Sequence, residues 1–173
     1  MSLRRSYGRG WSPLLVAACA ACSDGSGPAL EPDTFSVTLG GARDEALSGA
    51  PNAGVIFTEA AGAFFAVRMI DQDGPVLHVL VVQCPGTTPP APATYPLAPG
   101  AECQAGYSRF GPGSSPGSTE DEHADVRDGT LTITRTTGDE LTGSFRFSGS
   151  LLQGDAVTGA LTARGSFRAT IAP

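Results

Sequence analysis

Residues 130–172 read TLTITRTTGDELTGSFRFSGSLLQGDAVTGALTARGSFRATIA, and the tetrapeptide Gly-Ser-Phe-Arg occurs twice within them, at 143–146 and 165–168. In both copies apolar and polar residues alternate, with turn residues at 138–139 and 154–155. Alternation of period two between turns is typical of antiparallel strands with one face on a core. We therefore predict that the two copies lie side by side and direct Phe145 and Phe167 into one apolar interior.

Further alternating segments precede this stretch, and they extend the same pattern over the chain. Turn residues separate them, and no convincing helical periodicity interrupts them. The total is about eight strands, which predicts an all-β fold, an antiparallel sandwich or barrel. The expected strands are 34–39, 55–58, 64–70, 76–83, 104–110, 130–136, 141–151 and 157–172.

Several local features accompany these strands. Residues 76–83 (VLHVLVVQ) are apolar at nearly every position, which predicts a central strand buried on both faces. We expect loops at 42–54 and 111–125 and a turn at Asp128-Gly129. The last strand is expected to be interrupted near Gly165.

The composition restricts the class of partner. All eleven basic residues are Arg, and three of them lie at Arg4, Arg5 and Arg9. Beyond Cys22, eight Arg oppose seventeen Asp and Glu, a net charge of −9. Nucleic-acid binding depends on clustered positive charge, so this balance argues against a nucleic-acid partner.

The first residues have the parts of an export signal. Arg4, Arg5 and Arg9 supply positive charge, an apolar stretch follows at 11–18, and small residues lead into cysteines. The stretch is too short to cross a bilayer, which takes ~20 residues. Val16-Ala17-Ala18-Cys19 resembles the bacterial lipobox. Cys22, which has the longer apolar run before it and Ser23-Asp24 after it, is the preferred site of lipidation, with Cys19 as the alternative.

This interpretation predicts a signal peptide at 1–21, a flexible tether at 22–33 and one β-domain at 34–173. Residues 23–33 (SDGSGPALEPD) are small, polar and Pro-containing, as a tether requires. Acyl chains contribute ~0.8 kcal/mol per buried CH₂, so they would anchor the domain to a membrane. Ser23 stands where an Asp would typically retain a lipoprotein at the inner membrane, which favours the outer membrane of a Gram-negative cell.

The layout resembles that of small, uncharacterised bacterial lipoproteins with an all-β domain. The resemblance rests on the lipobox and on short strand motifs, and it covers most of the chain after Asp33. It implies an all-β fold and no particular activity. The motifs are ATYPL at 93–97, GTLTI at 129–133, GSFRF at 143–147 and GSF at 165–167.

Cys84 and Cys103 flank a segment that contains six Pro. Proline cannot donate to a strand ladder, so the segment is expected to be a crossover, with only 94–97 able to pair at an edge. In an exported protein, two such cysteines predict a disulfide. Closing the loop would contribute ~3 kcal/mol in the chain-entropy account.

No catalytic constellation, metal site or cofactor motif is predicted. His78 lies mid-strand, which favours a satisfied or solvent-facing role, and His123 lies in the acidic run at 120–125. That run, like Asp71-Gln72-Asp73-Gly74, lacks the full spacing of a Ca²⁺ loop. Arg146 and Arg168 could form a small basic stripe opposite the Phe face. We expect a lipid-anchored, non-catalytic envelope module that binds a protein or small ligand or serves structurally; the alternative is a divergent hydrolase or metal-dependent enzyme that uses 111–125.

Overall fold

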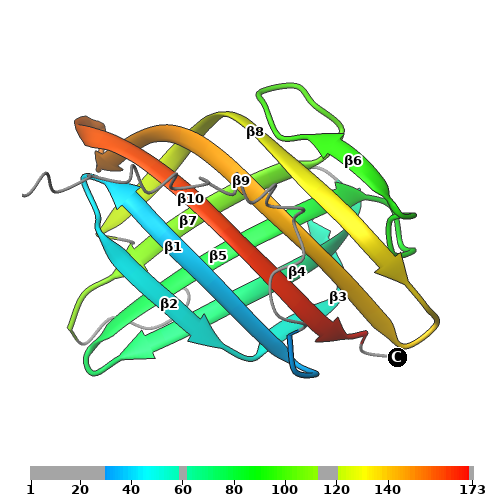
Figure 1. The fold of residues 1–173 in the computed structure, drawn as a ribbon. Helices are drawn as coiled ribbons and strands as arrows, with labels where there is room; N and C mark the ends of the chain where they lie inside the picture. Colours follow the sequence, from blue (N-terminus) through cyan, green and yellow to red (C-terminus); the bar gives the residue numbers. More distant parts are fainter. Residues whose placement is uncertain (1–29, 59–61, 113–120, 172–173) are drawn as a thin grey trace, which may run out of the picture.

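The computed structural model describes residues 30–58, 62–112 and 121–171, and the strands in these ranges form one antiparallel sheet (Figure 1). Neighbours along the sheet follow the order β2-β1-β10-β9-β8-β7-β5-β4-β3, and β6 pairs with β8 beside this path. The fold is all-β, as predicted. The strands are β1 (Thr34–Gly41), β2 (Glu45–Gly49), β3 (Pro51–Thr58), β4 (Gly62–Asp73), β5 (Val76–Pro85), β6 (Ala93–Pro96), β7 (Gln104–Phe110), β8 (Glu122–Thr136), β9 (Glu140–Gln153) and β10 (Ala156–Thr170).

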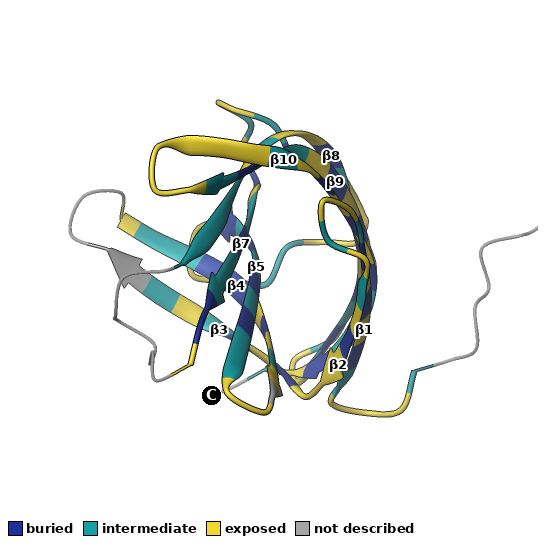
Figure 2. Ribbon diagram, turned by 90° about the vertical axis from the view of Figure 1, so that its left-hand side faces the viewer, coloured by how far each residue is buried: buried dark blue, intermediate teal, exposed yellow. Residues whose placement is uncertain are grey.

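One bent strand brings the two ends of the sheet together. β2 and β3 are separated only by Ala50, and β2 pairs with β1 while β3 pairs with β4. A bridge between Ala53 and Ile171 adds a contact across the remaining seam. The sheet therefore curls into a nearly closed barrel in which successive long strands are neighbours, the up-and-down arrangement (Figure 2).

The two Gly-Ser-Phe copies pair antiparallel, and each Phe faces the glycine of the other copy. Phe145 lies opposite Gly165, Phe167 lies opposite Gly143, and Ser144 lies opposite Ser166. A Cβ atom added to Gly143 would lie 2.8 Å from Cζ of Phe167, and one added to Gly165 would lie 2.8 Å from Cζ of Phe145. Glycine is therefore required at both positions because each ring occupies the space of a side chain on the partner strand.

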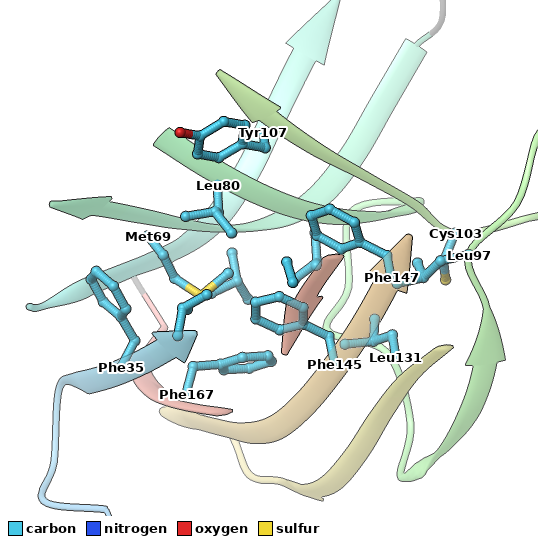
Figure 3. Packing of buried hydrophobic residues seen from close by; sticks show 14 of the residues in the cluster. Phe35, Met69, Leu80, Leu97, Cys103, Tyr107, Leu131, Phe145, Phe147 and Phe167 are labelled. Atoms are coloured by element: carbon cyan, nitrogen blue, oxygen red, sulfur yellow. The ribbon is translucent and has the colours of Figure 1, made fainter. Parts of the chain in front are cut away.

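Side chains fill the interior. Phe145 and Phe167 are 3% and 0% exposed, which confirms the prediction for these rings. They belong to a single apolar cluster that receives side chains from both halves of the sheet (Figure 3). Phe145 also stacks against Phe147, with ring centroids 5.9 Å apart. The labelled members of this cluster are Phe35, Met69, Leu80, Leu97, Cys103, Tyr107, Leu131, Phe145, Phe147 and Phe167.

The crossover between β5 and β7 is closed by a disulfide between Cys84 and Cys103. Cys84 lies near the end of β5 and Cys103 directly precedes β7, so the bridge joins two strands that also pair with each other. Both cysteines are buried, at 6% and 0% exposure. Within the crossover, the short β6 pairs with β8, in agreement with the edge pairing expected for 94–97.

One expected loop and an expected turn are wrong, and a second expected loop is wrong in part. Residues 42–54 contain β2 and the first half of β3, because alternation in this Gly- and Ala-rich stretch depends on small side chains that carry little pattern. There is no turn at Asp128-Gly129; β8 runs through it with a bulge at Arg127, where the register shifts between Val126 and Asp128. Bulges increase local twist and bend, which suits a curled sheet. Residues 122–125 belong to β8 rather than to a loop, and 113–120 lie outside the described residues.

Two further expectations are wrong: that β5 is buried on both faces, and that β10 is interrupted near Gly165. β5 buries alternate residues while its other face is only partly covered, so it is a barrel strand with one buried face. Its outward valines account for the continuous apolar pattern. β10 is not interrupted at Gly165, which pairs with both Val37 and Phe145.

Candidate functional site

A row of ionisable residues crosses four strands at one end of the barrel. Asp71 of β4 lies opposite His78 of β5, His78 lies opposite Arg109 of β7, and Arg109 lies opposite Glu122 of β8. Residues paired in this way share one face of a sheet. Because His78 is buried at 4% exposure, the row faces the interior. We call these residues, together with Arg43, Glu45 and Tyr107, the mouth cluster.

The strand patterns explain why this end of the barrel is polar. Inward positions of β5 read His78, Leu80, Val82 and Cys84, so only the first is polar. The inward positions of β7 likewise change from Tyr107 to Arg109 toward the same end. The apolar core therefore ends in a polar rim.

His78 is held between a hydroxyl and a carboxylate. Its Nδ1 lies 3.1 Å from Oη of Tyr107, and its Nε2 lies 3.5 Å from Oε2 of Glu45. Tyr107 can donate and a carboxylate can only accept, so the arrangement suits a neutral ring with Nδ1 accepting and Nε2 protonated. Burial lowers the pKa of His78 below 6.5; Arg109 and Arg43 act in the same direction, while Glu45 and Asp71 oppose it. Burial likewise raises the pKa of Tyr107, which stays protonated at neutral pH.

Two arginines tie the rim together. Arg43, in the β1–β2 connection, binds the carboxylate of Glu122 through Nε and Nη2, with Nε 3.0 Å from Oε2. Its Nη1 lies 3.8 Å from Glu45. Arg109 lies 3.9 Å from Asp121. The Arg43–Glu122 pair thus links the β1–β2 connection to β8 across the barrel end.

A pocket of about 510 Å³ opens at the mouth cluster, and two polar atoms in it lack hydrogen bonds. Oε2 of Glu45 and Nε of Arg109 are buried and form none with the described residues. A buried polar group without a partner costs ~1–3 kcal/mol, so such atoms are sites where a ligand or water would be stabilised. The pocket is lined by Glu45, Ala46, Leu47, Asp71, Gln72, Val76, His78 and Arg109.

The structure does not bring the residues singled out from the sequence together in one site. His78 is a buried, satisfied residue of the mouth cluster, one of the two roles expected for it. His123 lies in β8 opposite Ser108 and next to Glu122, so strand alternation places it on the other face. Glu122 binds Arg43 and Asp121 approaches Arg109, so the acidic run does not act as one cluster. Cys22 and Cys19 lie outside the described residues.

No metal centre is formed by the described residues: they contain no group of three or more His, Cys, Asp or Glu side chains placed to hold an ion. Sequence reasoning missed Arg43, Glu45, Tyr107 and Arg109 as members of a site. The signal that the sequence offers for such a site is a polar residue at an inward position near the end of a strand. The sequence does not show which of these residues lie together, because that depends on the register between strands.

No protein-family model matches this chain, and no curated protein or solved structure does either. Within the ranges that the structure describes, no helix has the length and apolar character needed to span a bilayer.

Proposed function

We propose that this chain is a lipid-anchored protein of the bacterial envelope, anchored through Cys22, with Cys19 as the alternative, whose barrel is a non-catalytic binding module. The single observation that carries the binding role is the mouth pocket, where buried polar atoms of Glu45 and Arg109 form no hydrogen bond with the described residues. The mouths of β-barrels are frequent sites for small ligands. The apolar interior behind the pocket is filled by side chains, so the ligand is held at the rim.

The chemistry of the rim defines the ligand class. Glu45 and Asp71 offer carboxylate acceptors, and Arg109 offers a donor. A small polyhydroxylated amine, such as an amino sugar, supplies an ammonium group for the carboxylates and oxygens for the guanidinium. The volume of about 510 Å³ accommodates a molecule of that size.

Binding is favoured over catalysis by the composition of the pocket. Its lining residues include no Ser, Thr or Cys that His78 could activate. Tyr107 is held protonated by its raised pKa, which makes it a hydrogen-bond donor rather than a nucleophile. These features support a site that recognises a ligand without transforming it.

Titration of ¹⁵N-labelled protein with glucosamine tests this proposal, with glucose as the matched probe that lacks the amine. We expect glucosamine to shift amide resonances around Glu45, His78 and Arg109, and glucose to do so much more weakly. Hydrogen bonds to charged groups contribute ~1.5–3 kcal/mol, so Glu45→Gln should weaken glucosamine binding roughly 10- to 100-fold. Shifts that are absent from the mouth, or that are unchanged in Glu45→Gln, would contradict the proposal.

A further inference from the structure

A row of polar side chains also crosses the outer face of the barrel, and two arginines lie at its centre. Thr38 of β1 pairs with Arg164 of β10, which pairs with Arg146 of β9, which pairs with Thr130 of β8. These four strands run side by side across one side of the barrel (Figure 1). The adjacent rows consist almost entirely of hydroxyl-bearing residues, and we call the whole surface the arginine face. Its other members are Ser36, Ser166, Ser144 and Thr132 on one side and Gly40, Thr162, Ser148 and Asp128 on the other.

The register differs from the stripe expected from the sequence. Arg168 lies opposite Thr142, and its guanidinium contacts Glu140 at 2.7 Å, so it is neutralised. Arg146 faces Arg164 instead, because the two Gly-Ser-Phe-Arg copies run in opposite directions.

The two central arginines have no carboxylate partner among the described residues. Arg146 donates from Nε to Oγ1 of Thr130 at 3.2 Å, and Arg164 takes part in no ion pair there. Like charges directly opposite each other destabilise a sheet, and only Asp128, at the margin, is acidic on these rows. On a domain with a large excess of carboxylates, this pair is a local cationic site suited to anions.

Hollows flank the arginine pair on both sides. Their volumes are about 650 and 680 Å³, and both are lined by Thr38, Thr130, Arg146 and Arg164. Hydroxyl groups, which can donate to phosphate oxygens, are most numerous in the larger hollow, at Ser36, Thr94, Thr132, Ser144 and Ser166. The other hollow adds the hydroxyls of Ser148 and Thr162 and, at its margin, the carboxylate of Asp128. The arginine face can therefore accept more than one anionic group at the same time.

The chain enters the barrel on this same face. Arg168 Nη1 donates to the carbonyl of Leu30 at 3.2 Å, and the amide of Thr170 donates to Asp33 at 2.7 Å. Figure 2 shows the described segment ahead of β1, residues 30–33, on the outer side of the sheet. Seven residues, 23–29, separate Cys22 from Leu30, and the eight steps along the chain reach at most about 29 Å. Arg164 lies four residues along β10 from Arg168, roughly 13 Å away, within that reach.

We propose that the arginine face docks on the bilayer to which the chain is anchored, with Arg146 and Arg164 bound to the phosphate groups of anionic lipids. This inference rests on the proposed lipid anchor. The tether delivers this face to the membrane, and the acidic surface elsewhere disfavours other orientations against an anionic bilayer. Two arginines bind weakly from solution, but the anchor converts their binding into an intramolecular event.

The test uses the mature chain, lipidated and freed of the signal peptide 1–21, in vesicles of phosphatidylcholine alone or mixed equally with phosphatidylglycerol. The chain has one Trp, in the predicted signal peptide, so Thr162→Trp on β10 and Val81→Trp on the opposite strand β5 supply single reporters. Quenching by a lipid with a nitroxide headgroup is expected to be several-fold stronger at position 162 than at 81, in the anionic vesicles only. Two arginines near an anionic surface change the ratio of docked to other orientations by roughly 30-fold. The double variant Arg146→Gln/Arg164→Gln should therefore abolish the difference in quenching between the two positions.

The double variant Arg68→Gln/Arg127→Gln removes the same charge elsewhere on the barrel and should retain the difference in quenching. This control distinguishes an effect of the arginine face from an effect of net charge. Unfolding curves of all variants establish that they fold. Vesicle sedimentation reports the anchor separately: Cys22→Ser should release the chain, whereas Cys19→Ser should not. A chain that sediments but is quenched equally at both positions overturns the docking alone. A chain with both cysteines intact that stays in the supernatant overturns the anchor and the docking together.

Discussion

At the scale of single residues, the polar environment of His78 couples the core to pH. The ring is buried against Tyr107, and burial lowers its pKa below 6.5. In the unfolded chain the same ring takes up a proton more readily. The contribution of His78 to stability is therefore complete above pH 6.5 and is lost as the pH falls toward its folded pKa.

We expect the free energy of unfolding to decrease as the pH is lowered below 6.5, and His78→Gln to reduce that slope, because Gln cannot titrate. Urea unfolding at a series of pH values measures the effect. Asp33→Asn is the control: the pKa of Asp33 is lowered from 3.8 chiefly by the Thr170 hydrogen bonds, so its contribution is lost only at more acid pH. A slope that is unchanged in His78→Gln would show that this ring is not its source.

Among single residues, the sequence was informative where a side chain meets the core directly. Phe145 and Phe167 were placed in the interior by alternation alone. Glu45 and Arg109 were not recognised, because only the pairing of distant strands brings them to one pocket. A charged residue at the end of a strand has the same local pattern whether it faces solvent or a pocket.

At the scale of elements, the pairing of β9 with β10 depends on the absence of two side chains. Gly143 and Gly165 each receive a ring from the opposite strand. Strand pairs of this kind fix the register, because a slip of one residue would turn every Phe to the outer face. The two copies of Gly-Ser-Phe are thus complementary surfaces as well as repeats.

Gly143→Ala and Gly165→Ala should each lower the free energy of unfolding by about 1–3 kcal/mol, the usual cost of overpacking a core. Gly106→Ala in β7 is the matched control, because no atom lies within 4 Å of the added Cβ. It should be neutral or slightly stabilising through the unfolded chain. Denaturant unfolding distinguishes the cases, and equal effects at all three positions would contradict the ring-over-glycine packing.

Elements were predicted well where side chains are large and poorly where they are small. The bounds of β7 agree with the expected 104–110, and the expected strand 55–58 is the second half of β3, whereas β2 and the first half of β3 lie in the expected loop 42–54. Their Ala, Gly and Asn residues carry little hydrophobic contrast, so their strand state is imposed by pairing with β1 and β4.

At the scale of the whole molecule, closure of the sheet determines where binding can occur. The interior is one continuous apolar cluster, so the usable surfaces are the rim and the outer face. The mouth cluster occupies the rim, and the arginine face lies on the side from which the chain leaves toward its predicted anchor. A barrel of this design can hold a small ligand at its end while one wall rests on a membrane.

The choice between sandwich and barrel could not be made from the sequence. It depends on the bend between β2 and β3 and on the bulge at Arg127, which are properties of three-dimensional pairing. The central claim is that the two Gly-Ser-Phe copies pair in this register and turn their rings into one core. Nuclear Overhauser spectroscopy of the full chain tests it most directly. The account predicts cross-peaks from the ring of Phe167 to the Hα protons of Gly143 and from the ring of Phe145 to those of Gly165; rings that instead contact only residues of their own strand would contradict it.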